Sequence, residues 1–223
     1  MALSIIIPVY NEVRAIRQVI EKVNAVPLEK EIIVIDDGST DGTDKVLREM
    51  CFDNLKIIYH GSNRGKGAAV LTGLMQALGD YVIVQDADFE YDPMDYLKLM
   101  EAMKNGAGDM VLGARFTKGY HGMVIPRAGN RFLTGLLNVL FGVRLNDCFT
   151  CYKLTRRSDI LALSLGSGSF DIEVEILAKA IKKRMRIAEV PISYNPRTYH
   201  DGKKIRVKDG LWAALRIVKF RFK

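Results

Sequence analysis

Apolar residues in the first half of the chain form short runs that alternate with segments of helical periodicity. The expected strands lie at residues 3–9, 31–35, 55–59, 81–84 and 110–113, where β-branched residues are frequent. The expected helices lie at residues 13–25, 46–50, 68–78 and 94–103. Because apolar strands that alternate with helices are typical of a sheet buried on both faces, we expect an α/β fold with a mainly parallel central sheet and helices on both faces.

The second half of the chain is more basic and its pattern is less regular. The expected helices lie at residues 132–140, 172–181 and 210–223, and the expected strands at residues 147–155 and 187–194. The segment 196–204 is expected to be a basic loop. Helix 210–223 mixes basic residues with Trp and Phe, which suits either an anchor at a membrane surface or a helix that packs on the core with a charged outer side.

Polar clusters follow the strands at the points where they end. They lie at residues 10–12, 36–38, 63–67 and 86–88. In parallel α/β sheets, ligands bind beyond the carboxyl ends of the strands. The placement of these clusters therefore predicts a ligand of nucleotide size.

The cluster after strand 81–84 is acidic, with Asp86, Asp88 and Glu90 at alternate positions. Residues two apart share a face in extended backbone, so these carboxylates repel one another and favour a bound cation. Mg²⁺ usually binds between one or two carboxylates and a substrate phosphate. The alternative is a solvated acidic loop.

The composition is that of a globular protein, with 223 residues, 48% hydrophobic residues and a net charge of +7. The charge is compatible with nucleic acid, an anionic membrane surface or a phosphorylated substrate. We expect no signal peptide, because residues 1–9 have no basic n-region and are predicted to form a strand. We expect no membrane-spanning segment, because no apolar run is long enough. The three cysteines include a lone C-x-x-C at Cys148 and Cys151, which favours free thiols in a reducing compartment over zinc or disulfides.

Two common phosphate-binding motifs are missing. No G-x-G-x-x-G follows the first strand, which disfavours a dinucleotide-dependent dehydrogenase. The segment 61–67 is one residue short of a P-loop and has Gly67 where Ser or Thr is required, which disfavours a P-loop ATPase. Lys66 could still contact a phosphate, or the segment could simply begin a helix. The three histidines lie in expected turns or loops and are interpreted as ordinary.

Taken in order, several motifs resemble those of the inverting nucleotide-sugar glycosyltransferases of family 2, which have the Rossmann-like GT-A fold. Within the family the resemblance is to the polyprenyl-phosphate glycosyltransferases, the group of the dolichyl-phosphate mannose synthases. The matching segments are residues 7–12, 34–39, 63–67, 86–88, 113–115, 170–173 and 189–192, with Arg197. The resemblance implies one domain, with a nucleotide-sugar-binding half at 1–113, an acceptor-binding half at 114–209 and a basic amphipathic helix at 210–223.

The resemblance also implies roles for individual residues. The implied donor-binding residues are Pro8, Tyr10, Glu12, Ile35, Asp37, Lys66, Asp86, Ala87, Asp88 and Arg197. Asp86 and Asp88 form the D-x-D that would hold Mg²⁺ or Mn²⁺ on the donor diphosphate, with Glu90 as a third ligand. Arg115 and Arg127, with Arg131 nearby, would bind the acceptor phosphate. The implied catalytic residues are Asp88, Arg115, Arg127 and Asp147.

The implied reaction moves a hexose, with mannose from GDP-mannose favoured by the resemblance, onto a polyprenyl or dolichyl phosphate. A phosphate acceptor is already an anionic nucleophile and needs no strong base. The alternative is a UDP-sugar-dependent transferase of glucose or N-acetylglucosamine that acts on a polyprenyl phosphate or on a saccharide hydroxyl. A hydroxyl acceptor would need a base, for which Asp147 or Glu173 are the candidates.

A basic module that binds nucleic acid is the non-enzyme alternative. It would interleave aromatic and basic residues on one surface, whereas acids cluster at the strand ends here, so no nucleic acid partner is expected. The resemblance implies a cytoplasmic enzyme, peripheral on the cytoplasmic face of a membrane or bound to a membrane subunit. The chain departs from the family at Cys151, where the D-x-x-x-G-(F/Y) motif has glycine, and it lacks the Q-x-x-R-W motif of polymerising relatives.

Overall fold

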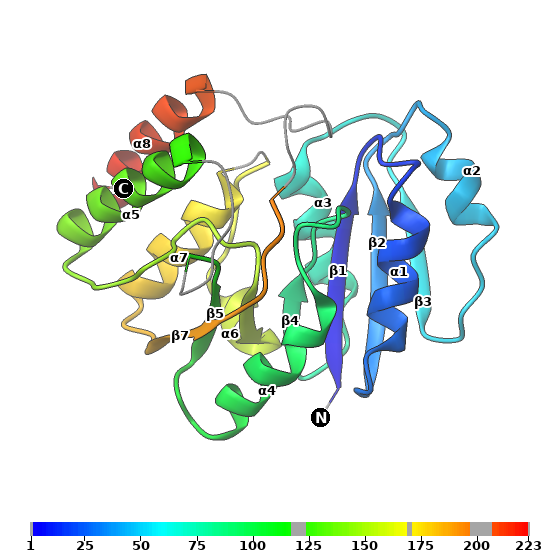
Figure 1. Cartoon of the computed structure of the whole chain (residues 1–223), viewed down its shortest axis with the longest axis horizontal. Helices are drawn as coiled ribbons and strands as arrows, with labels where there is room; N and C mark the ends of the chain where they lie inside the picture. Colours follow the sequence, from blue (N-terminus) through cyan, green and yellow to red (C-terminus); the bar gives the residue numbers. More distant parts are fainter. Residues whose placement is uncertain (1, 117–123, 169–170, 197–206, 223) are drawn as a thin grey trace.

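The computed structural model of the chain describes residues 2–116, 124–168, 171–196 and 207–222 (Figure 1). The strands are β1 (Leu3–Val9), β2 (Lys30–Asp36), β3 (Leu55–Tyr59), β4 (Tyr81–Val84), β5 (Met110–Ala114), β6 (Lys153–Arg156) and β7 (Ile187–Pro191). The helices are α1 (Ile16–Ala25), α2 (Thr43–Arg48), α3 (Lys66–Gln76), the 3₁₀ helix η1 (Pro93–Asp95), α4 (Tyr96–Lys104), α5 (Val124–Phe141), α6 (Arg157–Ala162), α7 (Ile172–Lys182) and α8 (Val207–Phe222).

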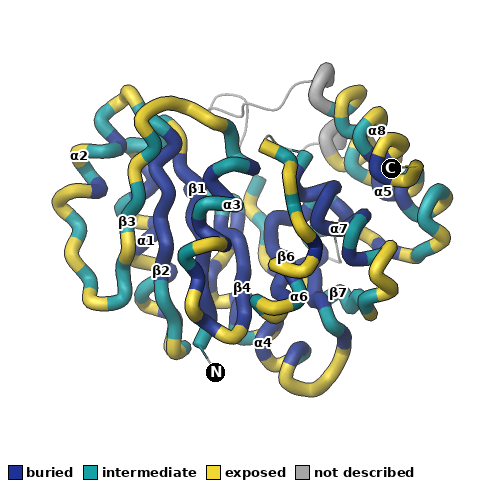
Figure 2. Tube along the Cα trace, turned by 180° about the vertical axis from the view of Figure 1, so that it is seen from behind, coloured by how far each residue is buried: buried dark blue, intermediate teal, exposed yellow. Residues whose placement is uncertain are grey.

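The strands form one sheet in the order β3-β2-β1-β4-β6-β5-β7. β1 pairs in parallel with β2 and β4, β2 with β3, and β5 with β7, whereas β6 runs antiparallel to both of its neighbours. Every residue of β1, β4 and β5 is buried (Figure 2). The apolar runs form inner strands for this reason, since both of their faces lie against helices. The expected α/β fold with a mainly parallel sheet is confirmed.

The helices cover both faces of the sheet and one of its ends. α1 and α4 lie on one face and α3 on the other (Figure 1). α3 packs on β1 and β2, where Gly73 allows close contact because a Cβ there would lie 2.4 Å from a side-chain atom of Ile6. Beyond β7, α5 and α8 lie side by side, and α8 also contacts α7 (Figures 1 and 2).

Two of the expected strands are shorter than the apolar pattern predicts. The strand expected at 147–155 begins at Lys153, because the backbone N–H groups of Asn146 and Asp147 donate to the carboxylate of Glu189. The strand expected at 187–194 ends at Pro191, after which Ser193 donates its backbone N–H to the carboxylate of Asp95, the last residue of η1. Side chains thus replace the strand hydrogen bonds at both places.

Two helices differ from the expectation in the second half. α5 begins at Val124 instead of residue 132, because Pro126 lies in the first helical turn, where its missing N–H costs nothing. α6 was not expected, since it is short and follows β6 without a turn signal. In the part of the chain that the structure describes, no helix combines the length and the apolar character that a membrane crossing requires.

Candidate active site

The carboxylate of Asp37 fixes the loop that precedes α3 at the carboxyl end of β2. It accepts hydrogen bonds from the backbone N–H groups of Arg64 and Gly65, at 3.0 and 2.7 Å. Nδ1 of His60 lies 2.7 Å from the same carboxylate. The loop passes so close to Gly38, which has φ of +74°, that a Cβ there would lie 2.6 Å from a backbone atom of the loop. Asp37, predicted to bind the donor, therefore also shapes the entrance to α3.

The residues expected to line the nucleoside pocket divide into buried and accessible ones. Pro8 and Ile35 are partners in the register of β1 and β2, and both are buried. The side chain of Ile35 is 0% exposed and lies beneath Gly73 of α3, so it belongs to the core and does not line an open pocket. Tyr10 is exposed and Glu12 is half-buried. A nucleoside could contact these last two side chains.

The acidic residues that follow β4 have different partners. The Asp86 carboxylate lies 2.6 Å from the ammonium of Lys66. Burial alone would raise the pKa of Asp86, but the Lys66 ammonium outweighs it and lowers the pKa below its ordinary value. The Asp88 carboxylate accepts a hydrogen bond from the Glu90 N–H at 3.0 Å, and the Glu90 carboxylate accepts one from the Tyr194 hydroxyl at 2.6 Å.

The expected three-ligand metal site is not formed as such. Among the residues that the structure describes, no three His, Cys, Asp or Glu side chains lie close enough to hold a metal ion. Asp86 and Asp88 still supply the hard oxygen donors that Mg²⁺ and Mn²⁺ take, and Mg²⁺ usually completes its shell with water and substrate phosphate. The residues therefore fit a two-carboxylate site that the donor diphosphate completes, whereas Glu90 binds Tyr194.

Arg115 and Asp147 form a buried bidentate ion pair. Nε and Nη2 of Arg115 donate to the two carboxylate oxygens at 2.7 and 2.8 Å, and the Asn130 amide donates at 3.1 Å. Burial would raise the pKa of Asp147, but Arg115 outweighs it and holds the pKa below its ordinary value. The rings of Phe116 and Tyr194 each lie 5.0 Å from the guanidinium carbon. Arg115 is predicted to bind the acceptor phosphate, but its Nε and Nη2 are bound to Asp147.

Arg127 and Arg131 lie one turn apart on α5, and both are exposed. They line a hollow of about 420 Å³ together with Phe116 and Asn130. Asn130 also connects this hollow to Arg115, whose Nη2 lies 3.4 Å from its amide oxygen. The structure therefore places two of the predicted acceptor arginines, Arg127 and Arg131, on one hollow, and Arg115 contacts Asn130 of its lining.

Glu173, the other candidate base, is held between two lysines. Its carboxylate oxygens lie 3.2 Å from Nζ of Lys66 and 2.7 Å from Nζ of Lys153. The Glu173 side chain is 10% exposed. Both of its oxygens therefore face a positive charge.

The three cysteines are free thiols, and the two of the C-x-x-C are buried. Burial raises the pKa of Cys148 to about 12 and raises the pKa of Cys151 well above its ordinary value. The Cys151 thiol donates to the carbonyl oxygen of Val84, and its N–H donates to the Tyr91 hydroxyl. The backbone of Cys151 does not have a positive φ, so the exchange of the family glycine for cysteine causes no strain here.

Several residues of the site carry no local signal in the sequence. Lys153 and Tyr194 act through partners more than fifteen residues away. Glu189 accepts a hydrogen bond from the backbone N–H of Asp147, the residue that pairs with Arg115. Asn130 resembles any polar residue of a helix until its contact with the ion pair is seen. Arg197, predicted to bind the donor, lies outside the described residues.

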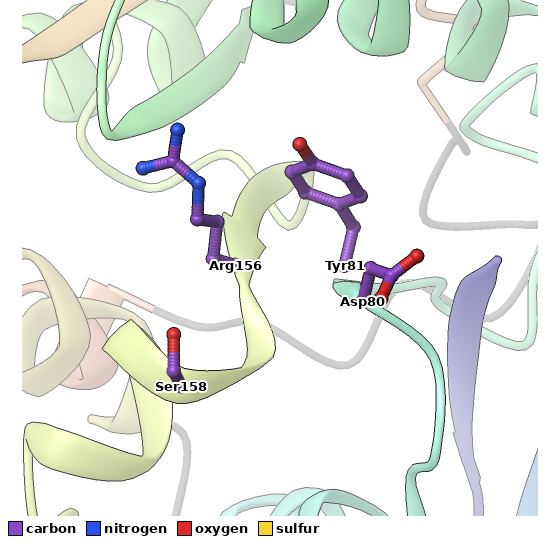
Figure 3. Close-up of a pocket in the computed structure, with 4 residues that line it drawn as sticks. All are labelled: Asp80, Tyr81, Arg156 and Ser158. Atoms are coloured by element: carbon purple, nitrogen blue, oxygen red, sulfur yellow. The ribbon is translucent and has the colours of Figure 1, made fainter. Parts of the chain in front are cut away.

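A second hollow lies at the opposite ends of the strands. It has a volume of about 360 Å³ and is lined by Asp80, Tyr81, Arg156 and Ser158 (Figure 3). Tyr81 begins β4 and Arg156 ends the antiparallel β6, so this hollow lies away from the D-x-D. It takes no part in the candidate site.

These observations define the class of the protein. A mainly parallel sheet carries two aspartates beyond the carboxyl end of β4, and Lys66 of α3 contacts one of them. The same domain has a hollow lined by two arginines, and the arrangement suits an anionic ligand of nucleotide size. The sequence model of glycosyl transferase family 2 matches residues 4–163. The chain belongs to this family.

Curated relatives support the same assignment. The chain is 32% identical over 222 aligned residues to the dolichyl-phosphate β-glucosyltransferase of Saccharomyces cerevisiae, and the match covers 86% of the chain and 66% of the relative. It is 30% identical to the dolichol-phosphate mannosyltransferase of Pyrococcus furiosus, over 91% of the chain and 59% of the relative. A hexosyltransferase of low-salt glycan biosynthesis from Haloferax volcanii is 31% identical, over 87% and 48%. The chain thus spans about half to two thirds of the length of these relatives.

Solved structures confirm the GT-A-like fold. The glucosyl-3-phosphoglycerate synthase of Mycobacterium tuberculosis in complex with UDP matches with a TM-score of 0.76 and 20% identity, over 99% of this chain and 80% of that chain. Another structure of that enzyme contains Mn²⁺, UDP-glucose and phosphoglyceric acid and matches with a TM-score of 0.73, at 18% identity, over 98% and 78%.

Proposed function

We propose that this chain is the catalytic domain of a metal-dependent inverting hexosyltransferase that moves a sugar from a nucleotide-sugar onto a polyprenyl or dolichyl phosphate. GDP-mannose is the first donor to test, and Mg²⁺ or Mn²⁺ is the proposed cofactor. Two relatives at 30% and 32% identity are named for transfer to dolichyl phosphate, which supports this acceptor.

One observation favours a phosphate over a hydroxyl as the acceptor. Both candidate bases are engaged with cations, since Asp147 forms the bidentate pair with Arg115 and Glu173 lies between two lysines. A carboxylate whose pKa is lowered by a paired cation is a poor proton acceptor near neutral pH, and this applies directly to Asp147. A phosphate monoester is already anionic and needs no such base, so a site whose two candidate bases are paired with cations suits it.

The residues of the site divide the work of the proposed reaction. Asp86 and Asp88 would orient the donor diphosphate through the metal ion, which offsets the charge that develops on the leaving group. Arg127 and Arg131 would bind the acceptor phosphate next to Arg115, which Asp147 keeps in position. An acceptor oxygen forms its bond to the anomeric carbon while the bond to the diphosphate oxygen breaks and its electron pair leaves with the diphosphate, which inverts the configuration.

The acceptor would be met at a membrane surface through the paired helices α5 and α8. Large apolar side chains are exposed there, namely Phe132, Val139, Leu211, Trp212 and Phe222. Basic residues lie on the same two helices, with Arg127 and Arg131 on α5 and Lys219 and Arg221 at the end of α8. Apolar and cationic side chains together suit an anionic lipid surface. The basic hollow opens on α5, so a lipid phosphate at that surface would lie next to it.

The test is transfer of labelled sugar into a lipid that organic solvent extracts. GDP-mannose, UDP-glucose and UDP-N-acetylglucosamine are each offered with dolichyl phosphate and Mn²⁺, with and without EDTA. We expect label in the lipid from one donor, its loss with EDTA, and its loss in Asp88→Ala. Label in a saccharide acceptor instead of the lipid would contradict the proposed acceptor, and an active Asp88→Ala variant would contradict the metal assignment.

A further inference from the structure

Four charged side chains form a continuous chain that leads inward from the D-x-D. Asp86 lies 2.6 Å from Lys66, Lys66 lies 3.2 Å from Glu173, and Glu173 lies 2.7 Å from Lys153. The exposed fraction of these side chains falls along the chain, from 27% and 15% to 10% and 3%. The signs of the four charges alternate, so each of these side chains has a neighbour of opposite charge.

The inner end of this chain is fixed, whereas the outer end is accessible. Lys153 is buried on β6 and also donates to the carbonyl oxygen of Thr150. It binds Oε2 of Glu173 and leaves Oε1 for Lys66. Lys66 therefore has two carboxylates of different character, a buried one that Lys153 holds in place and a more exposed one on Asp86.

A divalent cation at the D-x-D would compete with Lys66 for the same carboxylate. The ammonium lies 2.6 Å from Oδ1 of Asp86. A metal ion bound to the same carboxylate would therefore lie close to the ammonium, and the two positive charges would repel each other strongly. A displaced ammonium keeps Glu173 as a partner and needs a second anion. The diphosphate of a donor nucleotide is such an anion, and it also supplies oxygen ligands for the metal ion.

We propose that Lys66 is the counter-ion of Asp86 in the nucleotide-free protein. The divalent cation then takes the place of Lys66 on Asp86, and the nucleotide diphosphate takes the place of Asp86 on Lys66. The ammonium moves from Asp86 to the diphosphate while Glu173 remains its other partner. The proposal rests on the proposed function in that it takes Asp86 and Asp88 as the metal ligands. It follows that the metal ion binds weakly to the nucleotide-free protein and more tightly when the nucleotide is present, and that the nucleotide gains the same factor from the metal ion.

The experiment measures Mn²⁺ binding from the electron paramagnetic resonance signal of free Mn²⁺, with and without GDP or UDP. For the unchanged chain we expect the nucleotide to tighten Mn²⁺ binding about tenfold or more, a coupling of ordinary size. Lys66→Gln should tighten Mn²⁺ binding without nucleotide and remove most of this coupling. Lys66→Arg keeps the positive charge and should behave like the unchanged chain. Lys56→Gln, a change of an exposed lysine on β3, is the matched control and should have no effect.

A second variant gives a prediction of opposite sign. Glu173→Gln removes the inner anchor, so Lys66 depends on Asp86 alone and Mn²⁺ binding without nucleotide should weaken. This result remains informative if Lys66→Gln fails to fold, which circular dichroism would show.

The outcomes separate this proposal from the proposed function. If the unchanged chain and Lys66→Gln bind Mn²⁺ equally without nucleotide, while Asp88→Ala does not bind it, the role of Lys66 is refuted and the metal site remains. If none of these proteins binds Mn²⁺ with either nucleotide, the metal assignment in the proposed function is itself wrong.

Discussion

The buried ion pair of Arg115 and Asp147 gives the sharpest stability prediction. Asp147→Asn keeps the shape of the side chain and removes its charge, so the Arg115 guanidinium remains buried without a counter-ion. Breaking a buried pair from one side costs about 3–5 kcal/mol. Asparagine retains one acceptor oxygen for the guanidinium, so we expect the lower end, a loss of about 3 kcal/mol in the free energy of unfolding.

The measurement is urea unfolding followed by circular dichroism, with the melting temperature as a second readout. A loss of about 3 kcal/mol lowers the melting temperature by about 6–12 °C in a domain of this size. Asp109→Asn is the matched control, because Asp109 binds Nε and Nη2 of Arg186 in the same bidentate way, but at the surface. An exposed pair is worth about 0–1 kcal/mol, so the control should lose much less.

The same pair predicts a dependence on pH. Because the pKa of Asp147 is lower in the folded protein than its ordinary value of about 3.9, its stabilisation is complete above that value and is lost as the pH falls through the folded pKa. The unchanged chain should therefore lose more stability on acidification than Asp147→Asn. A loss below about 1 kcal/mol at pH 7, equal to that of the control, would refute the reasoning about burial.

Three further predictions concern the loop before α3, the thiols and the membrane-facing helices. Gly38→Ala should destabilise the fold by about 2–4 kcal/mol in urea unfolding, because it adds a steric clash at a residue with positive φ. Gly106→Ala, at a similar φ in open space, should cost about 1 kcal/mol. Equal losses would contradict the close approach of the loop to Gly38. Cys51 alone should react with a thiol reagent in the folded protein at pH 8, counted by absorbance, and a second fast thiol would contradict the burial of the other two. Trp212→Glu should weaken binding to anionic vesicles about tenfold or more in flotation assays. Leu78→Glu, a change of an exposed residue after α3, is the control and should leave binding unchanged. Equal effects of the two changes would exclude α8 as the membrane contact.

The sequence was sufficient to predict the strands β1 to β4, because each of them is an apolar run that a polar cluster follows. The D-x-D followed from the same logic, since Asp86 and Asp88 come directly after β4. The second half was harder to predict. β6 lies between β4 and β5 although it follows β5 in the chain, and no local pattern encodes that insertion.

The partners of the site residues also could not be read from spacing. Asp147 was predicted as a catalytic residue, but the sequence gives no sign that its carboxylate binds Arg115, 32 positions away. Lys66 was predicted as a donor-binding residue, and its contact with Asp86 depends on how α3 packs against the strands. Long-range pairs of this kind are decided by tertiary packing, whereas periodicity reports only local structure.

The position of β6 has a consequence for the order in which the chain can fold. β4 pairs through Tyr81 and Val82 with residues of β6 that are synthesised more than seventy positions later. β5 is complete long before then, yet in the described sheet it reaches β4 through β6. On the ribosome, the four strands β3-β2-β1-β4 can therefore assemble first with an open edge at β4. β5 joins this sheet only after β6 has been synthesised. We expect the closing of that edge to be a late, slow, long-range step, which joins the half that carries Asp86 and Asp88 to the half that carries the arginines.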